Sequence, residues 1–95
     1  MKPKTKEEVE IWIIAWLQDN AGVTSESIDL NKPFADYHLD SLTSIELSYD
    51  LEEWTGKELT VTTAWNYPTI NKMSEYLAGL FFVFISLIVF DRLHT

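Results

Sequence analysis

The sequence predicts a small all-α domain, an antiparallel helical bundle of three main helices plus one short helix. Three observations support this prediction. Apolar residues repeat at the helical period in three separate segments, each preceded by a residue that favours a helix N-cap. Glycine or proline stands where two of these segments end and where the last one begins. A chain of 95 residues is large enough for one domain with a single modest core.

The composition excludes several classes of site. The chain has no cysteine, so disulfides, thiolate metal sites and a cysteine nucleophile are all excluded. Its two histidines, His38 and His94, lie far apart and lack metal-ligand spacing, and no metal site is expected. The net charge of −8 opposes binding to nucleic acid or anionic membranes and favours basic protein partners. No apolar run of the signal-peptide kind follows the first residues, so a cytoplasmic location is expected.

The first helix is expected to begin after Thr5 and to end at Gly22. Thr5 and Glu8 have the spacing of a capping box, in which each side chain reaches the backbone N–H of the other residue. Apolar residues then recur at i, i+3, i+4, i+7 and i+8, which places them on one face of a helix. This face, including both tryptophans, is assigned to the core and comprises Val9, Trp12, Ile13, Trp16 and Leu17.

Residues 23–39 break the helical pattern and predict a long loop. The segment is rich in polar and turn-forming residues, and three apolar side chains, Ile28, Leu30 and Phe34, are spaced along it as anchors. Structureless loops of this length are uncommon in compact domains and are often functional.

The second helix is expected to run from Ser41 to about Thr55, with Gly56 as its terminator. Asp40 is a good N-cap residue because its carboxylate can accept from a free N–H group of the first turn. Ser41 is thereby placed at the mouth of the helix, beside the positive end of its dipole. A phosphate attached to the Ser41 hydroxyl would lie in a favourable field.

Three sets of side chains line this helix. The core stripe comprises Leu47, Leu51 and Trp54, a second apolar stripe comprises Leu42, Ile45 and Tyr49, and an acidic row comprises Glu46, Asp50 and Glu53. Like charges at this spacing repel by a few tenths of a kcal/mol per pair, so the acidic row is mildly unfavourable for the helix. Two interpretations of the last two sets remain: an ordinary solvated face, or a docking surface with an apolar centre and an acidic rim.

The remaining elements follow from local signals. Residues 57–63 are expected to be extended, with Leu59 and Val61 turned inward, and residues 62–67 to hold one short helical turn. Pro68 blocks its continuation and Thr69 can cap the last helix. The inward face of that helix comprises Ile70, Met73, Leu77 and Leu80.

A C-terminal apolar run does not fit the bundle. Residues 80–90 are all apolar except Ser86 and lack amphipathic periodicity. As a helix they would span about 16 Å, roughly half of a ~30 Å hydrocarbon core, so a membrane span is not expected. A packed extra segment, a contact with a partner or a membrane surface, and an added sequence remain as alternatives.

An independent enzyme is not predicted. His38, Asp40 and Ser41 are residue types of a nucleophilic triad, but no Gly-x-Ser-x-Gly elbow surrounds the serine and no second loop offers obvious oxyanion donors. No catalytic residue is therefore assigned.

The ordered motifs of the chain resemble those of the phosphopantetheine-binding carrier domains, most closely the acyl carrier proteins of polyketide and fatty-acid synthesis. The motifs, spread over about residues 7–80, are Asp40-Ser41-Leu42, Ile45-Glu46-Leu47, Leu51-Glu52-Glu53, Leu59 and Tyr67-Pro68-Thr69-Ile70. The resemblance implies a carrier domain over residues 1–80, followed by the tail of residues 81–95. It also implies a 4'-phosphopantetheine arm, derived from coenzyme A, on Ser41, beside the cap Asp40. The arm would carry acyl groups as thioesters.

The resemblance also implies the partners. A phosphopantetheinyl transferase would install the arm, and acyltransferase or ligase and ketosynthase-type enzymes would use it. The second helix would dock these enzymes, which favours the docking interpretation of its exposed side chains. His38 departs from the family pattern, because it stands where the family usually has glycine. Two alternatives remain: a peptidyl or aminoacyl carrier of peptide synthesis, and a helical interaction domain in which Ser41 only caps a helix.

Overall fold

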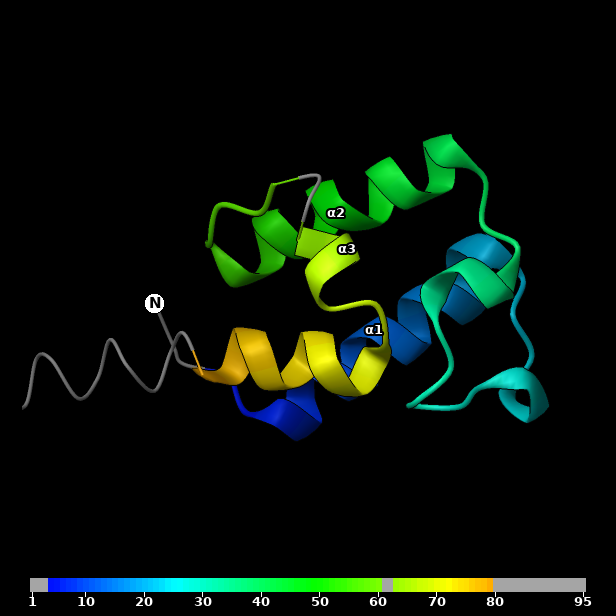
Figure 1. Cartoon of the computed structure of the whole chain (residues 1–95), viewed down its shortest axis with the longest axis horizontal. Coiled ribbons are helices and arrows are strands. Elements are labelled where there is room, and N and C mark those ends of the chain that lie inside the picture. Colours follow the sequence, from blue (N-terminus) through cyan, green and yellow to red (C-terminus); the bar gives the residue numbers. More distant parts are fainter. Residues whose placement is uncertain (1–3, 61–62, 80–95) are drawn as a thin grey trace, which may run out of the picture.

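The computed structural model describes residues 4–60 and 63–79 and confirms the predicted all-helical bundle (Figure 1). The elements in chain order are α1 (Lys6–Ala21), the 3₁₀ turns η1 (Ser25–Ser27) and η2 (Phe34–Tyr37), α2 (Ser41–Thr55) and α3 (Thr63–Asn66). A last helix follows, of which residues 70–79 are described. In Figure 1, α1 runs antiparallel to both α2 and the last helix. The predictions for Val61 and Leu80, and for residues 81–95, lie outside the described residues.

The helix ends agree with the capping signals in the sequence. Thr5 Oγ1 accepts from Glu8 N at 3.1 Å, and Gly22 takes a left-handed conformation with φ of 67° at the end of α1. Gly56 ends α2 in the same way, with φ of 68°. Thr69 Oγ1 accepts from Lys72 N at 3.1 Å, as expected of the cap of the last helix. The two side-chain caps satisfy backbone N–H groups that a helix start leaves free, and the two glycines let the backbone N–H bond back to a carbonyl of the last turn.

The core lies where the apolar faces of α1, α2 and the last helix meet. Its buried hydrophobic residues are Val9, Ile13, Trp16, Leu17, Tyr37, Leu47, Leu51, Ile70, Met73 and Leu77. Beside them, Lys6 Nζ lies 3.5 Å from Glu10 Oε1 and 3.6 Å from Glu75 Oε1, which links the start of α1 to the last helix. The helical stripes predicted from sequence therefore account for most of this core.

The predicted core was wrong at Trp12 and Trp54, because both side chains are only partly buried. Their rings stack at a centroid distance of 5.1 Å, and Lys4 Nζ lies 4.7 Å from the centre of the Trp54 ring. The two indoles thus form a flat contact at the edge of the core. Large aromatic side chains are often placed in this way, since they are rarely buried completely.

The loop between α1 and α2 is held against the start of the last helix. Phe34 N donates to Pro68 O at 2.8 Å, and Asn71 N donates to Leu30 O at 2.9 Å. All three predicted anchors of this loop are partly buried against the core. The loop is thereby held by backbone hydrogen bonds to residues 68 and 71 and by apolar contacts with the core before it reaches Ser41.

Candidate functional site

Ser41 is the first residue of α2, and its side chain is exposed. The preceding residue, Asp40, has extended backbone angles and caps the helix: Asp40 Oδ1 accepts from Thr43 N at 2.7 Å. The cap is therefore supplied by Asp40, and the Ser41 hydroxyl is not needed for it. Ser41 stands at the positive end of a 15-residue helix with its hydroxyl accessible.

The pKa of Asp40 is lowered from its ordinary value of 3.8, chiefly by the hydrogen bond from the Thr43 backbone N–H and further by the Thr43 side chain. Hydrogen bonds to the charged form of a carboxyl group favour ionisation. Asp40 thus remains a carboxylate, and hence a cap, at any pH near neutrality.

His38 is in the left-handed region, with φ of 58° and ψ of 36°. It is the non-glycine residue with positive φ in the described part of the chain. This conformation lets the backbone turn from η2 into the extended residues before α2, while His38 N donates to Ala35 O at 3.3 Å. Histidine occupies this region more readily than most residues, although glycine does so without steric strain. The position therefore has the geometry for which glycine is suited.

Tyr37 supports the approach to the site and was missed by the sequence analysis. Its hydroxyl accepts from Asp29 N at 3.0 Å and donates to Asp29 O at 2.9 Å, and its side chain is buried. Lys32 Nζ lies 4.6 Å from the ring centre. A single aromatic residue in a polar segment has no periodic pattern that would predict its burial. The composition of the segment predicted only a loop with a few apolar anchors.

The second apolar stripe of α2 faces solvent, as predicted. Leu42, Ile45 and Tyr49 are 65%, 46% and 66% exposed, an unusual fraction for large hydrophobic side chains on one helix. Glu46 and Glu53 of the acidic row are exposed as well.

The third member of the acidic row, Asp50, differs from the other two because it contacts α1. Its Oδ2 accepts from the indole Nε1 of Trp16 on α1 at 2.7 Å. Asp50 therefore connects α2 to a buried tryptophan, a role that neither interpretation of the acidic row included. Such a contact joins residues 34 positions apart, and no local pattern predicts it.

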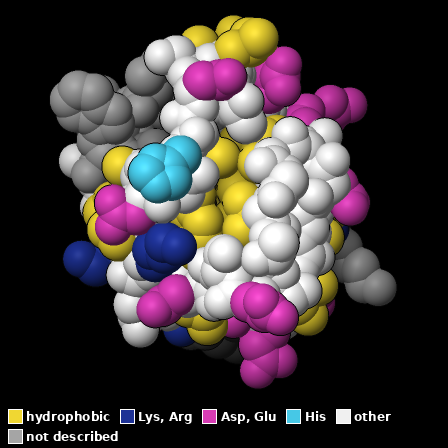
Figure 2. All heavy atoms as spheres, turned by 90° about the vertical axis from the view of Figure 1, so that its right-hand side faces the viewer, with side chains coloured by type: hydrophobic (Ala, Val, Ile, Leu, Met, Phe, Trp, Pro, Cys, Tyr) yellow, Lys and Arg dark blue, Asp and Glu magenta, His cyan; other side chains and the backbone are white. Residues whose placement is uncertain are grey.

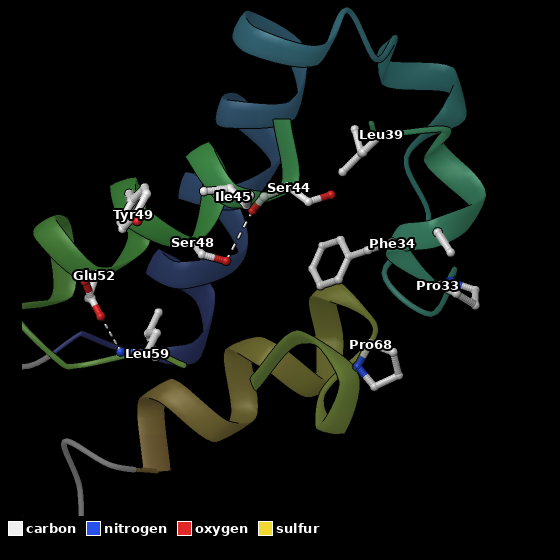
Figure 3. Close-up of a pocket in the computed structure, with 11 residues that line it drawn as sticks. Pro33, Phe34, Leu39, Ser44, Ile45, Ser48, Tyr49, Glu52, Leu59 and Pro68 are labelled. Atoms are coloured by element: carbon white, nitrogen blue, oxygen red, sulfur yellow. Dashed lines mark hydrogen bonds between the residues drawn. The ribbon is translucent and has the colours of Figure 1, made fainter. Parts of the chain in front are cut away.

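A groove lies beside α2 and was not predicted. It has a volume of about 670 Å³, within the range of ligand pockets, and is mainly hydrophobic. One side is formed by α2 and the other by the loop before it together with Leu59 and Pro68; the remaining lining residues are Pro33, Phe34, Ala35, Leu39, Ser44, Ile45, Ser48, Tyr49 and Glu52 (Figure 3). The face shown in Figure 2 has a hollow in which hydrophobic side chains are visible, with acidic side chains near its edges.

Other kinds of site find no support in the described part of the chain. Over residues 4–60 and 63–79, no three metal-ligating side chains come together. In the same residues, none of the helices has the length and apolar character needed to cross a bilayer. The structure instead brings together an exposed serine at a helix mouth, an adjacent groove and an exposed apolar stripe.

A small helical bundle with these features has the architecture expected of a carrier domain, and comparison with known proteins supports that class. Residues 12–77 match the family described as "Phosphopantetheine attachment site". The acyl carrier protein TtuC of Teredinibacter turnerae is 28% identical over 75 residues, which cover 79% of this chain and 86% of that protein. The phenolphthiocerol/phthiocerol polyketide synthase of Mycobacterium tuberculosis includes a polypeptide that is 34% identical over 68 residues; these are 72% of this chain but 4% of that polypeptide.

Two solved structures are similar in fold and sequence. A free-standing peptidyl carrier protein from an uncharacterized secondary metabolic pathway of Acinetobacter baumannii has a TM-score of 0.71 and 37% identity, covering 79% of this chain and 94% of that one. An acyl carrier protein of Anabaena sp. PCC 7120, with a variant phosphopantetheinylation-site sequence, has a TM-score of 0.74 and 32% identity, covering 85% and 92%.

The chain belongs to the phosphopantetheine-binding carrier family. Its prosthetic group is a covalently attached 4'-phosphopantetheine, which makes it a carrier protein.

Proposed function

We propose that Ser41 is the residue that carries the phosphopantetheine arm, in a non-catalytic acyl carrier of polyketide assembly. The observation that supports this most is the position of Ser41 as the exposed first residue of α2, with the cap already supplied by Asp40. The dipole of α2 favours a phosphodiester there. Ser41 Oγ would form the new phosphorus–oxygen bond with the phosphopantetheinyl group of coenzyme A. Adenosine 3',5'-bisphosphate leaves, and the transferase takes the hydroxyl proton.

The second part of the proposal concerns partners. The exposed side chains Leu42, Ile45 and Tyr49 form an apolar centre, and Glu46 and Glu53 add negative charge next to it. Basic enzymes would be attracted to this surface, since complementary charge mainly raises the association rate. A phosphopantetheinyl transferase, an acyltransferase or ligase and a ketosynthase-type enzyme are the expected partners, in the cytoplasm. The matched segments of polyketide synthases support this pathway.

The attachment residue is tested by incubating the protein with coenzyme A and a broad-specificity phosphopantetheinyl transferase. Intact mass should rise by one phosphopantetheinyl group in the wild type and in Ser44→Ala, and should stay unchanged in Ser41→Ala. Ser44 is the matched control because it lies one turn further along the same helix. Modification of Ser41→Ala would contradict the assignment, and no modification of the wild type would support a plain interaction domain.

A peptidyl carrier is the second candidate, because one solved relative at 37% identity is a peptidyl carrier protein. The two candidates differ in the enzyme that loads the arm. Loading by an acyltransferase from an acyl coenzyme A would support the acyl carrier. Loading only by an adenylating enzyme with an amino acid would support the peptidyl carrier.

We also propose that the carrier domain ends near Leu80. The buried residues Ile70, Met73 and Leu77 give the last helix its core contacts before that point. Residues 81–95 would then have no part in folding or in modification.

A further inference from the structure

The two ends of the bundle carry different features. In Figure 1 the start of α2, which is Ser41, lies at the right-hand end, whereas the start of α1, the end of α2 and the end of the last helix lie toward the left. Lys6 Nζ lies 3.6 Å from Glu75 Oε1, so the start of α1 is beside the last turn of that helix. The chain therefore leaves the bundle opposite to Ser41, at what we call the exit end: the start of α1, the end of α2 and residues 75–79.

An aromatic pair lies near the exit end. Trp54 is the next-to-last residue of α2, Trp12 belongs to the first half of α1, and their rings stack at a centroid distance of 5.1 Å. Both side chains are only partly buried, and Lys4 Nζ lies 4.7 Å from the centre of the Trp54 ring. Ile11, next to Trp12 in the chain, is 67% exposed. Tryptophan and lysine side chains with accessible apolar parts are typical of the boundary between water and lipid.

The apolar run that follows the exit end has no role in the carrier function proposed above. Residues 81–90 lie outside the described residues; in sequence they are apolar except for Ser86, and they include four of the five phenylalanines of the chain. Leu77, the last core residue of the described helix, precedes them. A segment that is apolar on all sides is suited to an apolar phase, because it has no polar face to turn toward water.

The length of this run and the residues after it limit how it can enter a bilayer. At the helical rise of 1.5 Å per residue, residues 81–90 correspond to about 15 Å, which is too short to cross a hydrocarbon core of ~30 Å. Asp91 and Arg92 follow directly, and charged side chains are costly inside hydrocarbon. The run therefore fits within one leaflet, with the charges that follow it kept at the water boundary.

We propose that the exit end is a membrane-surface site, in which residues 81–90 enter one leaflet of a neutral bilayer, Trp12 and Trp54 lie at its boundary, and Ser41 faces water. Neutral lipids fit best because the net charge is −8 and two exposed glutamates occupy the first turn of α1, which disfavours anionic headgroups. The proposal does not depend on attachment at Ser41. An arm attached there would extend away from the bilayer, toward enzymes in solution.

The first test is flotation of the full chain with phosphatidylcholine vesicles on a sucrose gradient, because vesicles rise whereas protein aggregates sink. The wild type should rise with the vesicles. The double substitution Phe84→Glu and Ile88→Glu should lower the floating fraction at least about ten-fold, since two charges would have to enter hydrocarbon. The matched control Leu42→Glu, at a residue that is 65% exposed near the other end of the bundle, should rise like the wild type.

The orientation is tested with single fluorescent labels, which is possible because the chain has no cysteine. A label on Gly79→Cys, where an added Cβ meets no atom within 4 Å, should be quenched by vesicles of brominated phosphatidylcholine. A label on Ser41→Cys, at the other end, should not be quenched. Thermal melts followed by circular dichroism check that both labelled proteins are folded.

Wild-type protein that stays below the vesicles would overturn the proposal; if that protein also sediments as an oligomer, the apolar run joins copies of the chain instead. Flotation of the double variant equal to that of the wild type would overturn it as well. Equal quenching of the two labels would contradict the orientation in which Ser41 faces water.

Discussion

The contact between Asp50 and Trp16 predicts that one exposed carboxylate contributes strongly to stability. The Trp16 side chain is only 6% exposed, and its indole Nε1 donates to Asp50 Oδ2 at 2.7 Å. Asp50→Ala would leave this donor without its partner. A hydrogen bond to a charged group contributes about 1.5–3 kcal/mol, and an unpaired buried donor costs about 1–3 kcal/mol. Because Asp50 is itself exposed, we take the low end and expect a loss of about 1.5 kcal/mol.

The assay is thermal unfolding followed by circular dichroism, with urea unfolding as a second measurement. For a domain of this size, about 1.5 kcal/mol corresponds to a fall in melting temperature of roughly 6–12 °C. Glu53→Ala is the matched control, since it removes an exposed acid from the same helix and also introduces alanine. Asp50→Asn should lose less than Asp50→Ala, because the amide oxygen can still accept from the indole.

Equal melting temperatures of Asp50→Ala and Glu53→Ala would contradict this prediction. A double-mutant cycle gives an independent check. Trp16→Phe removes the donor and keeps most of the ring, so Asp50→Ala should cost much less in that background than in the wild type. Equal costs in both backgrounds would show that the two side chains are not coupled.

Four further predictions follow from the site and its surroundings. Glu46→Lys with Glu53→Lys should slow modification by the transferase and reduce its salt dependence without lowering the melting temperature by more than a few degrees; unchanged kinetics at low salt would assign these acids to an ordinary solvated face. His38→Gly should raise stability by about 0.5 kcal/mol, because relief of left-handed strain exceeds the added chain entropy of glycine, and a lower melting temperature would contradict this. Asp40→Asn should be less stable than the wild type at pH 7. Because the pKa of Asp40 is lowered in the folded state, its contribution to the free energy of unfolding is present above about pH 4 and is lost as the pH falls through the folded pKa. The melting temperatures of the variant and the wild type should therefore converge below about pH 4. A constant difference between them would contradict the lowered pKa. A chain truncated after Leu80 should melt cooperatively at nearly the same temperature and still be modified, and loss of the melt would place residues 81–95 in the core.

The parts of the fold that sequence predicts well are those governed by neighbouring residues. Thr5, Asp40 and Thr69 cap helices because each side chain bonds a backbone N–H three residues later. Gly22 and Gly56 end helices because the left-handed conformation is open to glycine. These signals lie within one helical turn, so they can be recognised before the tertiary structure is known.

The features that sequence did not predict depend on residues far apart. Asp50 looked like one member of an acidic row until the structure placed it 2.7 Å from the Trp16 indole. The groove needs the loop before α2, held to Pro68 through Phe34, and no pattern in any single segment indicates it. Tyr37 is held in its buried position by two hydrogen bonds to the backbone of Asp29, and it does not belong to the apolar face of a helix.

The arrangement of side chains around α2 explains how one helix can serve both cargo and partners. Successive faces carry the core residues, the groove-lining polar residues Ser44, Ser48 and Glu52, the exposed apolar stripe and the acidic row. Ile45 and Tyr49 belong to two of these sets, because they are exposed and also line the groove. A partner that covers these two side chains would therefore contact the rim of the groove at the same time. On the proposed function, an enzyme that docks on α2 would therefore also change the surroundings of the groove through Ile45 and Tyr49.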